Sequence, residues 1–194
     1  MHKKLTIGIL ALQGAFREHA NVLKALDVRV VEVRLPSHLK DIQGLIIPGG
    51  ESTTIKKLML EYAFPGEIRK FASLGKPIFG TCAGLIVMAK KVHGRVQDFL
   101  NLIDIDVERN AYGRQIDSRE VDLDIPALGE KTFRAVFIRA PQIIRIGRSV
   151  APLGHYQNQI IFARQKNILV ATFHPELTGD KRIHEYFIQM CSNP

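Results

Sequence analysis

The chain has 194 residues, of which 46% are hydrophobic and 24% charged, a composition typical of globular proteins. This length favours one domain spanning residues 1–194. No apolar run approaches the ~18 residues that cross a bilayer. The apolar stretch 5–12 is followed by Gln13, Gly14 and charged residues rather than by a leader cleavage site. We therefore expect a cytoplasmic protein with no membrane segment.

The net charge of +8 comes from 27 basic and 19 acidic residues. The basic residues occur in scattered pairs such as Lys3-Lys4 and Lys56-Lys57, without the basic helix or stacked aromatic residues of nucleic-acid-binding proteins. The charge indicates a solvated surface, or else an acidic protein partner or phosphorylated metabolites, and we expect no nucleic acid. Only two cysteines occur, which favours a reducing compartment over a disulfide framework.

Short apolar segments rich in β-branched residues alternate with helix-like segments over most of the chain. Such alternation is typical of βαβ units, so we expect an α/β fold with a mostly parallel central sheet and helices on both faces. The expected strands are 6–12, 28–33, 44–48, 77–80 and 168–173, and the expected helices are 16–26, 53–62, 66–74 and 83–90.

The middle of the chain has a different pattern. From residue 102 to about 146, apolar and polar residues alternate, which predicts strands with one solvated face, antiparallel and at one edge of the sheet. Segments 155–156 and 160–162 predict a further hairpin. Near the C-terminus, Ile183, Phe187 and Met190 share one helical face, and Cys191 lies beside them as inert packing.

The segment 80–84, Gly-Thr-Cys-Ala-Gly, stands between a predicted strand and a predicted helix. The G-x-C-x-G spacing is a cysteine version of the nucleophile elbow, in which small flanking residues allow a sharp, strained turn. The helix N-terminus would favour a thiolate at Cys82, and the Ala83 N–H could donate to an oxyanion. From these five residues alone, a buried cysteine beside two turn glycines is an equal alternative.

His174, Pro175 and Glu176 follow the last predicted strand. In an extended chain, residues two apart project to the same side, so the imidazole and the carboxylate can lie together. A carboxylate beside a histidine sets its tautomer and stabilises the imidazolium, as in catalytic triads. A solvated turn is the alternative for this tripeptide alone, but Cys82 also follows a parallel strand, and together they predict a Cys82–His174–Glu176 triad. No metal-binding spacing occurs, and we expect neither metal nor cofactor.

Six segments, taken together and in order, resemble the glutaminase subunits of pyridoxal 5′-phosphate synthases, a branch of the class I glutamine amidotransferases. The resemblance covers nearly the whole chain, and the segments are 11–14, 48–53, 80–84, 108–110 with 113–115, 137–141 and 174–178. It implies a three-layer fold with an antiparallel edge. It also implies hydrolysis of L-glutamine to glutamate and ammonia, with the ammonia passed to a (β/α)8-barrel synthase subunit in a hetero-oligomer. That partner makes pyridoxal 5′-phosphate from ribose 5-phosphate and glyceraldehyde 3-phosphate.

The resemblance also implies roles for individual residues. A guanidinium suits the carboxylate of free glutamine and an acidic side chain suits its ammonium group, while glycine N–H groups suit an oxyanion. Arg109 and Arg139 could otherwise be ordinary strand charges, and Glu51-Ser52 could simply cap a helix. The implied glutamine-binding residues are Gly50, Glu51, Ser52, Arg109, Ile138 and Arg139, and the implied oxyanion-hole residues are Gly49, Gly50 and Ala83, with Gln13 and Gly14 nearby.

Two positions depart from relatives. Ile86 stands four residues after the cysteine, where many class I amidotransferases have glutamine; this weakens the anthranilate and carbamoyl-phosphate branches and agrees with the vitamin B6 branch. Arg119 stands where many relatives have an aromatic residue. The alternative functions are a cysteine peptidase or γ-glutamyl hydrolase, which would need an open cleft, and an inactive regulatory module, against which the intact triad argues.

Overall fold

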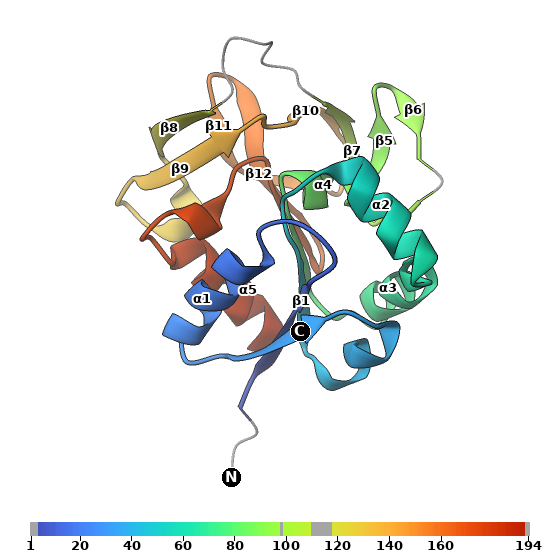
Figure 1. The fold of residues 1–194 in the computed structure, drawn as a ribbon. Coiled ribbons are helices and arrows are strands. Elements are labelled where there is room, and N and C mark those ends of the chain that lie inside the picture. The colour runs from blue at the N-terminus through green and yellow to red at the C-terminus, as the bar shows by residue number, and fades with distance from the viewer. Residues whose placement is uncertain (1–3, 98, 110–117, 193–194) are drawn as a thin grey trace.

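A long mixed sheet organises the chain (Figure 1). The computed structural model describes residues 4–97, 99–109 and 118–192, and within them an 11-stranded sheet has the order β2-β1-β3-β4-β13-β12-β10-β7-β5-β6, with β11 paired to β12. Its strands are β1 (Thr6–Leu10), β2 (Arg29–Val33), β3 (Gly44–Ile47), β4 (Ile78–Thr81), β5 (Ala89–Val92), β6 (Arg95–Val96), β7 (Ile103–Glu108), β10 (Gln142–Ile146), β11 (Ala151–Tyr156), β12 (Gln159–Gln165) and β13 (Ile168–Ala171).

Five neighbouring strands, β2-β1-β3-β4-β13, are all parallel, as expected from the sequence. Every residue of β1, β3, β4 and β13 is buried, because helices cover both faces of this part of the sheet and nearly continuous apolar segments suit such strands. Ligand sites in such sheets form beyond the carboxyl ends of the strands. Here the segments that follow β1, β3, β4 and β13 meet at one edge.

Helices cover the two faces of the sheet, with α1 and α5 on one side and α2 and α3 on the other (Figure 1). Two apolar cores result, one under each layer of helices. The helices are α1 (Phe16–Ala25), α2 (Ser52–Glu61), α3 (Phe64–Ser73), α4 (Ala83–Met88) and α5 (Arg182–Ser192), with short 3-10 helices η1 (Pro36–Asp41), η2 (Pro126–Leu128) and η3 (Pro175–Leu177). The helix expected over 83–90 therefore ends at Met88, where β5 begins. No helix among the described residues is long and apolar enough to span a membrane.

The prediction for the middle segment is correct in part. β7 lies in the main sheet, antiparallel to β10 and parallel to β5, and β11 with β12 forms the expected hairpin. However, within the part of the chain that the structure describes, β8 (Ser118–Leu123) and β9 (Phe133–Ile138) pair only with each other and form a separate two-stranded sheet. The inward residues of this hairpin, such as Phe133 and Phe137, pack into the core shared with α1 and α5 instead of extending the main sheet.

Candidate active site

Cys82 occupies a strained turn between β4 and α4. Its backbone has φ 48° and ψ −103°, which is unusual for a residue with a side chain. The turn requires the flanking glycines: a Cβ on Gly84 would collide with the backbone oxygen of Ile47, and one on Gly80 would lie 2.6 Å from the sulfur of Met88. The Cys82 sulfur lies 3.8 Å from the Ile138 carbonyl oxygen. These contacts confirm the predicted elbow geometry.

His174 lies beside Cys82 because β13 and β4 are parallel neighbours, with Ala171 paired to Thr81 at their carboxyl ends. Its Nδ1 is 2.7 Å from Oε1 of Glu176, and both side chains are almost fully buried. The backbone N–H of His174 donates to Val136 of β9 at 2.8 Å, so the separate hairpin helps to hold the imidazole. The structure thus brings together all three residues of the predicted triad.

The charges of these groups are coupled. Burial lowers the pKa of His174, but hydrogen bonds with Cys82 and Glu176 and the charges of these two groups outweigh it and raise the pKa to about 10. Burial of Glu176 is likewise outweighed by His19 and His174, which hold the pKa of the carboxyl below its ordinary value. These contacts favour an imidazolium at His174 beside the ionised carboxylate of Glu176, next to the Cys82 sulfur.

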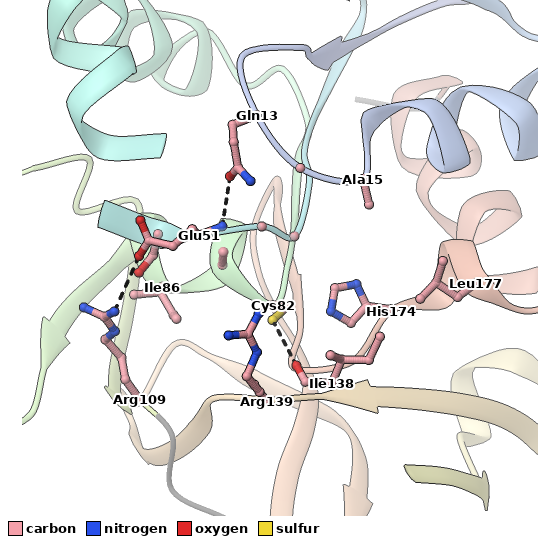
Figure 2. Close-up of a pocket in the computed structure, with 15 residues that line it drawn as sticks. Gln13, Ala15, Glu51, Cys82, Ile86, Arg109, Ile138, Arg139, His174 and Leu177 are labelled. Carbon is pink, nitrogen blue, oxygen red and sulfur yellow. Dashed lines mark hydrogen bonds and ion pairs between the residues drawn. The ribbon is translucent and has the colours of Figure 1, made fainter. Parts of the chain in front are cut away.

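A pocket of about 400 Å³ opens in front of Cys82 and His174 (Figure 2). Every site residue expected from the sequence lines it except Glu176, which is buried behind His174. The lining residues are Gln13, Gly14, Ala15, Gly49, Gly50, Glu51, Ser52, Cys82, Ala83, Ile86, Arg109, Ile138, Arg139, His174 and Leu177. The six segments that carried the resemblance thus converge on one pocket, apart from residues 110 and 113–115, which lie outside the described residues.

Gly49, one of the expected oxyanion-hole residues, has an acceptor for its N–H within the chain. Its N–H donates to the hydroxyl oxygen of Thr81 at 3.0 Å, so this group already has a partner in the structure. Gly49 instead makes room for His174, because a Cβ there would collide with the imidazole ring. The N–H of Ala83 lies in the first turn of α4, where no intrahelical acceptor exists. Ala83 and Gly50 therefore remain the expected donors.

Gln13 and Gly14 bind the loop after β3 rather than standing apart from it. The Gln13 side-chain oxygen accepts from the Glu51 N–H at 2.9 Å, and the Gly49 carbonyl accepts from the Ala15 N–H at 3.0 Å. Gly14 has φ 100°, and a Cβ there would collide with the Gly49 oxygen, so only glycine fits. Figure 2 shows Gln13 reaching across to the backbone of Glu51.

Glu51 has a structural role that the sequence left open. Its carboxylate caps α2 by accepting from the backbone N–H groups of Thr53 and Thr54 at 3.0 and 2.6 Å. Hydrogen bonds from Thr53 and Thr54, side chain and backbone, lower the pKa of Glu51 to about 2. Arg109 lies 3.8 Å from the same carboxylate, and both side chains remain partly exposed at the pocket (Figure 2). The two candidate glutamine-binding charges are thus adjacent.

Ile138 and Arg139 stand at the end of β9, opposite the loop after β3. Arg139 has φ 43° and its side chain points into the pocket in Figure 2. The unusual Arg119 of β8 lies between two rings, 5.2 Å from the centre of Phe137 and 4.8 Å from that of Tyr156. A guanidinium stacks on aromatic faces, so Arg119 fills the position of an aromatic residue without reaching the pocket.

The sequence did not reveal several residues that support the site. Ala15 and Leu177 line the pocket but are small or apolar; Ala15 follows segment 11–14, and Leu177 lies within segment 174–178. Thr81 lies inside the elbow motif and holds Gly49, although no spacing marks it as special. His19 lies 3.3 Å from Glu176 and carries no motif of its own. No group of three or more His, Cys, Asp or Glu residues among those described could hold a metal ion.

The site combines a strained cysteine at a strand–helix elbow with a histidine and a buried carboxylate, on an α/β sheet. This combination is typical of cysteine-nucleophile amide hydrolases. Comparison with known proteins identifies the family, because residues 9–193 match the SNO glutamine amidotransferase family. The chain therefore belongs to this family of glutamine amidotransferases, which confirms the enzyme class expected from the sequence.

Individual relatives agree with this assignment. The chain is 56% identical to the pyridoxal 5′-phosphate synthase subunit PdxT of Pelotomaculum thermopropionicum over 96% of its length and 95% of the relative's. It is 52% identical to the protein of the same name from Moorella thermoacetica, over 96% and 99% of the two chains. A crystal structure described as a glutamine amidotransferase, 46% identical, superposes with a TM-score of 0.90 and covers 96% of this chain and 98% of its own. PurLQS of Thermotoga maritima, 18% identical, has a TM-score of 0.73 over 96% and 99% of the chains and shares the fold.

Proposed function

We propose that this chain hydrolyses L-glutamine to L-glutamate and ammonia as the glutaminase subunit of a pyridoxal 5′-phosphate synthase. The observation that carries the proposal is one pocket lined by the Cys82 elbow, His174 and the Arg109–Glu51 pair. Two close relatives are named as subunits of that synthase. Cys82 and Cys191 are both free thiols, which fits a reducing compartment, and we assign the protein to the cytoplasm. We also propose that residues 1–194 form a single glutaminase domain.

Recognition of free glutamine requires a site for its carboxylate and another for its ammonium group. Arg109 offers the first, and Glu51, kept ionised by its low pKa, offers the second. Burial lowers the pKa of Lys56, and the positive charge of nearby Arg109 lowers it further. An excess of positive charge on this side favours an anionic group there. Gly50, Ser52, Ile138 and Arg139 line the remaining wall.

The reaction follows from the positions of the side chains. The Cys82 thiolate attacks the side-chain amide carbon, and the resulting oxyanion accepts hydrogen bonds from the N–H groups of Gly50 and Ala83. His174 donates its proton to the amide nitrogen, so that the C–N bond breaks and ammonia leaves a glutamyl thioester. A water molecule then loses a proton to His174 and attacks the thioester, which releases glutamate and the thiolate. Glu176 stabilises the imidazolium in both steps.

Ammonia must reach its acceptor without escaping, since the ammonium ion formed in water is not a nucleophile. We therefore assign the ammonia to a (β/α)8-barrel synthase subunit in a hetero-oligomer. That subunit would use it to build pyridoxal 5′-phosphate from ribose 5-phosphate and glyceraldehyde 3-phosphate. Because loss of one oxyanion donor costs on the order of 10²–10³ in kcat, docking that re-aims the Gly49–Gly50 backbone would switch the enzyme on.

The test is glutamate release from glutamine by the full chain, alone and with its synthase partner. We expect weak activity alone, a much larger kcat in the complex, and no activity in Cys82→Ser. Cys191→Ser is the matched control, because Cys191 is buried in α5 and its burial raises the thiol pKa to about 12. Hydrolysis of γ-glutamyl peptides in preference to glutamine would contradict the substrate assignment, and equal kcat values with and without partner would contradict the switch.

A further inference from the structure

A buried polar cluster extends from Glu176 away from the pocket. His19 of α1 and His184 of α5 have no exposed surface, and neither lines the pocket. Nε2 of His19 is 3.3 Å from Oε2 of Glu176, and Nδ1 of His19 is 2.9 Å from Nε2 of His184. The chain of contacts therefore runs from His174 through both oxygens of the Glu176 carboxylate to two further imidazoles.

His19 also contacts the other side of the site through Thr81. Its Nε2 is 3.2 Å from the Thr81 hydroxyl oxygen, which accepts the N–H of Gly49. Thr81 is the residue before Cys82, and Gly49 packs against the His174 ring. His19 thus links the triad carboxylate to the loop after β3 through Thr81.

The proton positions follow from burial and partners. Burial lowers the pKa of His19 and lowers that of His184 to about 3, so both rings are neutral and each has one N–H. A carboxylate oxygen is attracted to an N–H and repelled by a bare ring nitrogen, so the 3.3 Å contact with Oε2 of Glu176 favours the proton on Nε2 of His19, whose hydrogen bond is with Thr81. Nδ1 of His19 then accepts from Nε2–H of His184.

This assignment leaves Nδ1 of His184 without a proton, and it is the nitrogen of that ring for which the structure provides no partner. The opposite tautomers would place the bare Nε2 of His19 against the carboxylate and leave a buried N–H of His184 unpaired, which is costly. Oε2 of Glu176 itself makes no hydrogen bond among the described residues, so its 3.3 Å contact with Nε2 of His19 is electrostatic.

We propose that His19 is a positioning residue of the triad: its Nε2 edge, hydrogen-bonded to Thr81 and 3.3 Å from the second oxygen of Glu176, keeps the first oxygen on His174, while His184 fixes the tautomer of His19. The proposal rests on the glutaminase function proposed above. Without His19, a buried carboxylate oxygen that has no hydrogen bond would also lose its polar neighbour, so Glu176 would rotate or take up a proton. Either change removes the charged partner of His174, although His19 itself touches no substrate.

The test compares two variants of His19, one without a hydrogen-bonding group in the side chain and one with such a group. His19→Phe keeps a ring but no donor, whereas His19→Gln keeps an amide donor and acceptor. We expect the synthase complex of His19→Phe to lose roughly 10- to 100-fold in kcat with KM for glutamine within about two-fold, since small displacements of catalytic groups cost this much. His19→Gln should recover most of kcat, and His184→Leu should show a smaller loss. Exposed His155→Gln serves as the control.

An unchanged kcat in folded His19→Phe, or equal losses in the Phe and Gln variants, would overturn the proposal. If thermal unfolding shows that His19→Phe does not fold, the kcat and KM of His19→Gln and His184→Leu decide, and a loss in KM alone counts against positioning. A wild-type complex that releases no glutamate would overturn the glutaminase function instead. Alkylation of Cys82 by iodoacetamide needs no glutamine and still tests the inference: it should be slower in His19→Phe than in wild type and His19→Gln, and equal rates would overturn it.

Discussion

Glu176 can act only through His174, because it is buried behind the imidazole and does not line the pocket. Glu176→Gln keeps the shape of the side chain but removes the charge that stabilises the imidazolium. We expect turnover to fall by about 10²–10⁴-fold, as in triad variants of other enzymes. Steady-state glutamate release measures it, with exposed Glu185→Gln of α5 as the control. Activity within a few-fold of wild type would make Glu176 a turn residue.

Arg109 should determine the affinity for the free amino acid. Its Ala variant removes charge-assisted hydrogen bonds to the substrate carboxylate, each worth about 1.5–3 kcal/mol, so KM for glutamine should rise at least ~10-fold. The matched control is Arg134→Ala, which removes an exposed arginine paired with Glu120 at 2.9 Å, away from the pocket. A KM that stays at the wild-type value in Arg109→Ala would leave this residue as a partner of Glu51 only.

The residues that could be predicted from sequence are those whose role depends on local spacing. His174 and Glu176 are two positions apart on an extended segment, and the glycines around Cys82 mark its sharp turn. His19 could not be predicted, because its partners Glu176 and His184 lie at the other end of the chain and meet it only through the sheet. For Glu51, the sequence allowed either a glutamine-binding role or a helix cap, and in the structure its carboxylate caps α2.

At the scale of elements, two helical glycines differ in whether the surrounding structure leaves room for a side chain. Gly84→Ala places a methyl group against the Ile47 carbonyl of β3, which cannot move without the strand. We expect a loss of about 1–3 kcal/mol in the free energy of unfolding, typical of overpacking. Gly66 of α3 has open space around it, so Gly66→Ala should gain about 0.4–1 kcal/mol. Guanidinium unfolding midpoints measure both, and a Gly84→Ala midpoint at or above wild type would refute the close approach of α4 to β3.

The predicted architecture differs from the structure in where β8 and β9 lie. Alternating residues correctly indicate strands in β8 and β9, with Phe133 and Phe137 turned inward. The alternation of apolar and polar residues shows which face of a strand is buried but not which element covers it. A strand at a sheet edge and a strand in a separate hairpin both bury one face, so they have the same pattern. The hairpin packs over the carboxyl end of β13, where Val136 accepts the His174 N–H. This tertiary contact has no local sequence signal.

Across the whole molecule, the parallel half of the sheet carries the site and could be predicted well, because its buried strands are short apolar segments between helices. Four of its strands end at the pocket, so each motif that follows a strand contributes one wall. Arg139, after β9 of the separate hairpin, and Arg109, after β7 of the antiparallel half, form the opposite wall. Pairing within that half depends on bulges and register shifts, which alternation does not specify.

Stability of the whole molecule should fall in mild acid because two histidines are buried as neutral rings. The folded pKa values of His19 and His184 are lowered, to about 3 for His184, so each ring adds stability above its unfolded pKa of ~6.5 that is lost as pH falls. His174 has the opposite sign: its pKa is raised to about 10, so its contribution is complete below pH ~6.5 and is lost progressively as pH rises from there to about 10.

The window from pH 7 to pH 5 therefore reports mainly the buried pair, since the lowered pKa of Glu176 moves its own loss below that range and the opposite change at His174 falls mostly between pH 7 and ~6.5. For His184 alone, the unfolding free energy should drop by about 2 kcal/mol over these two pH units, because one pKa unit corresponds to about 1.36 kcal/mol. Urea unfolding at pH 5, 6 and 7 measures the slope. His184→Leu should flatten it, whereas exposed His155→Leu should not. A wild-type stability that is constant over this window would mean that the two imidazoles are charged or solvated in the native protein, contrary to their burial between α1 and α5.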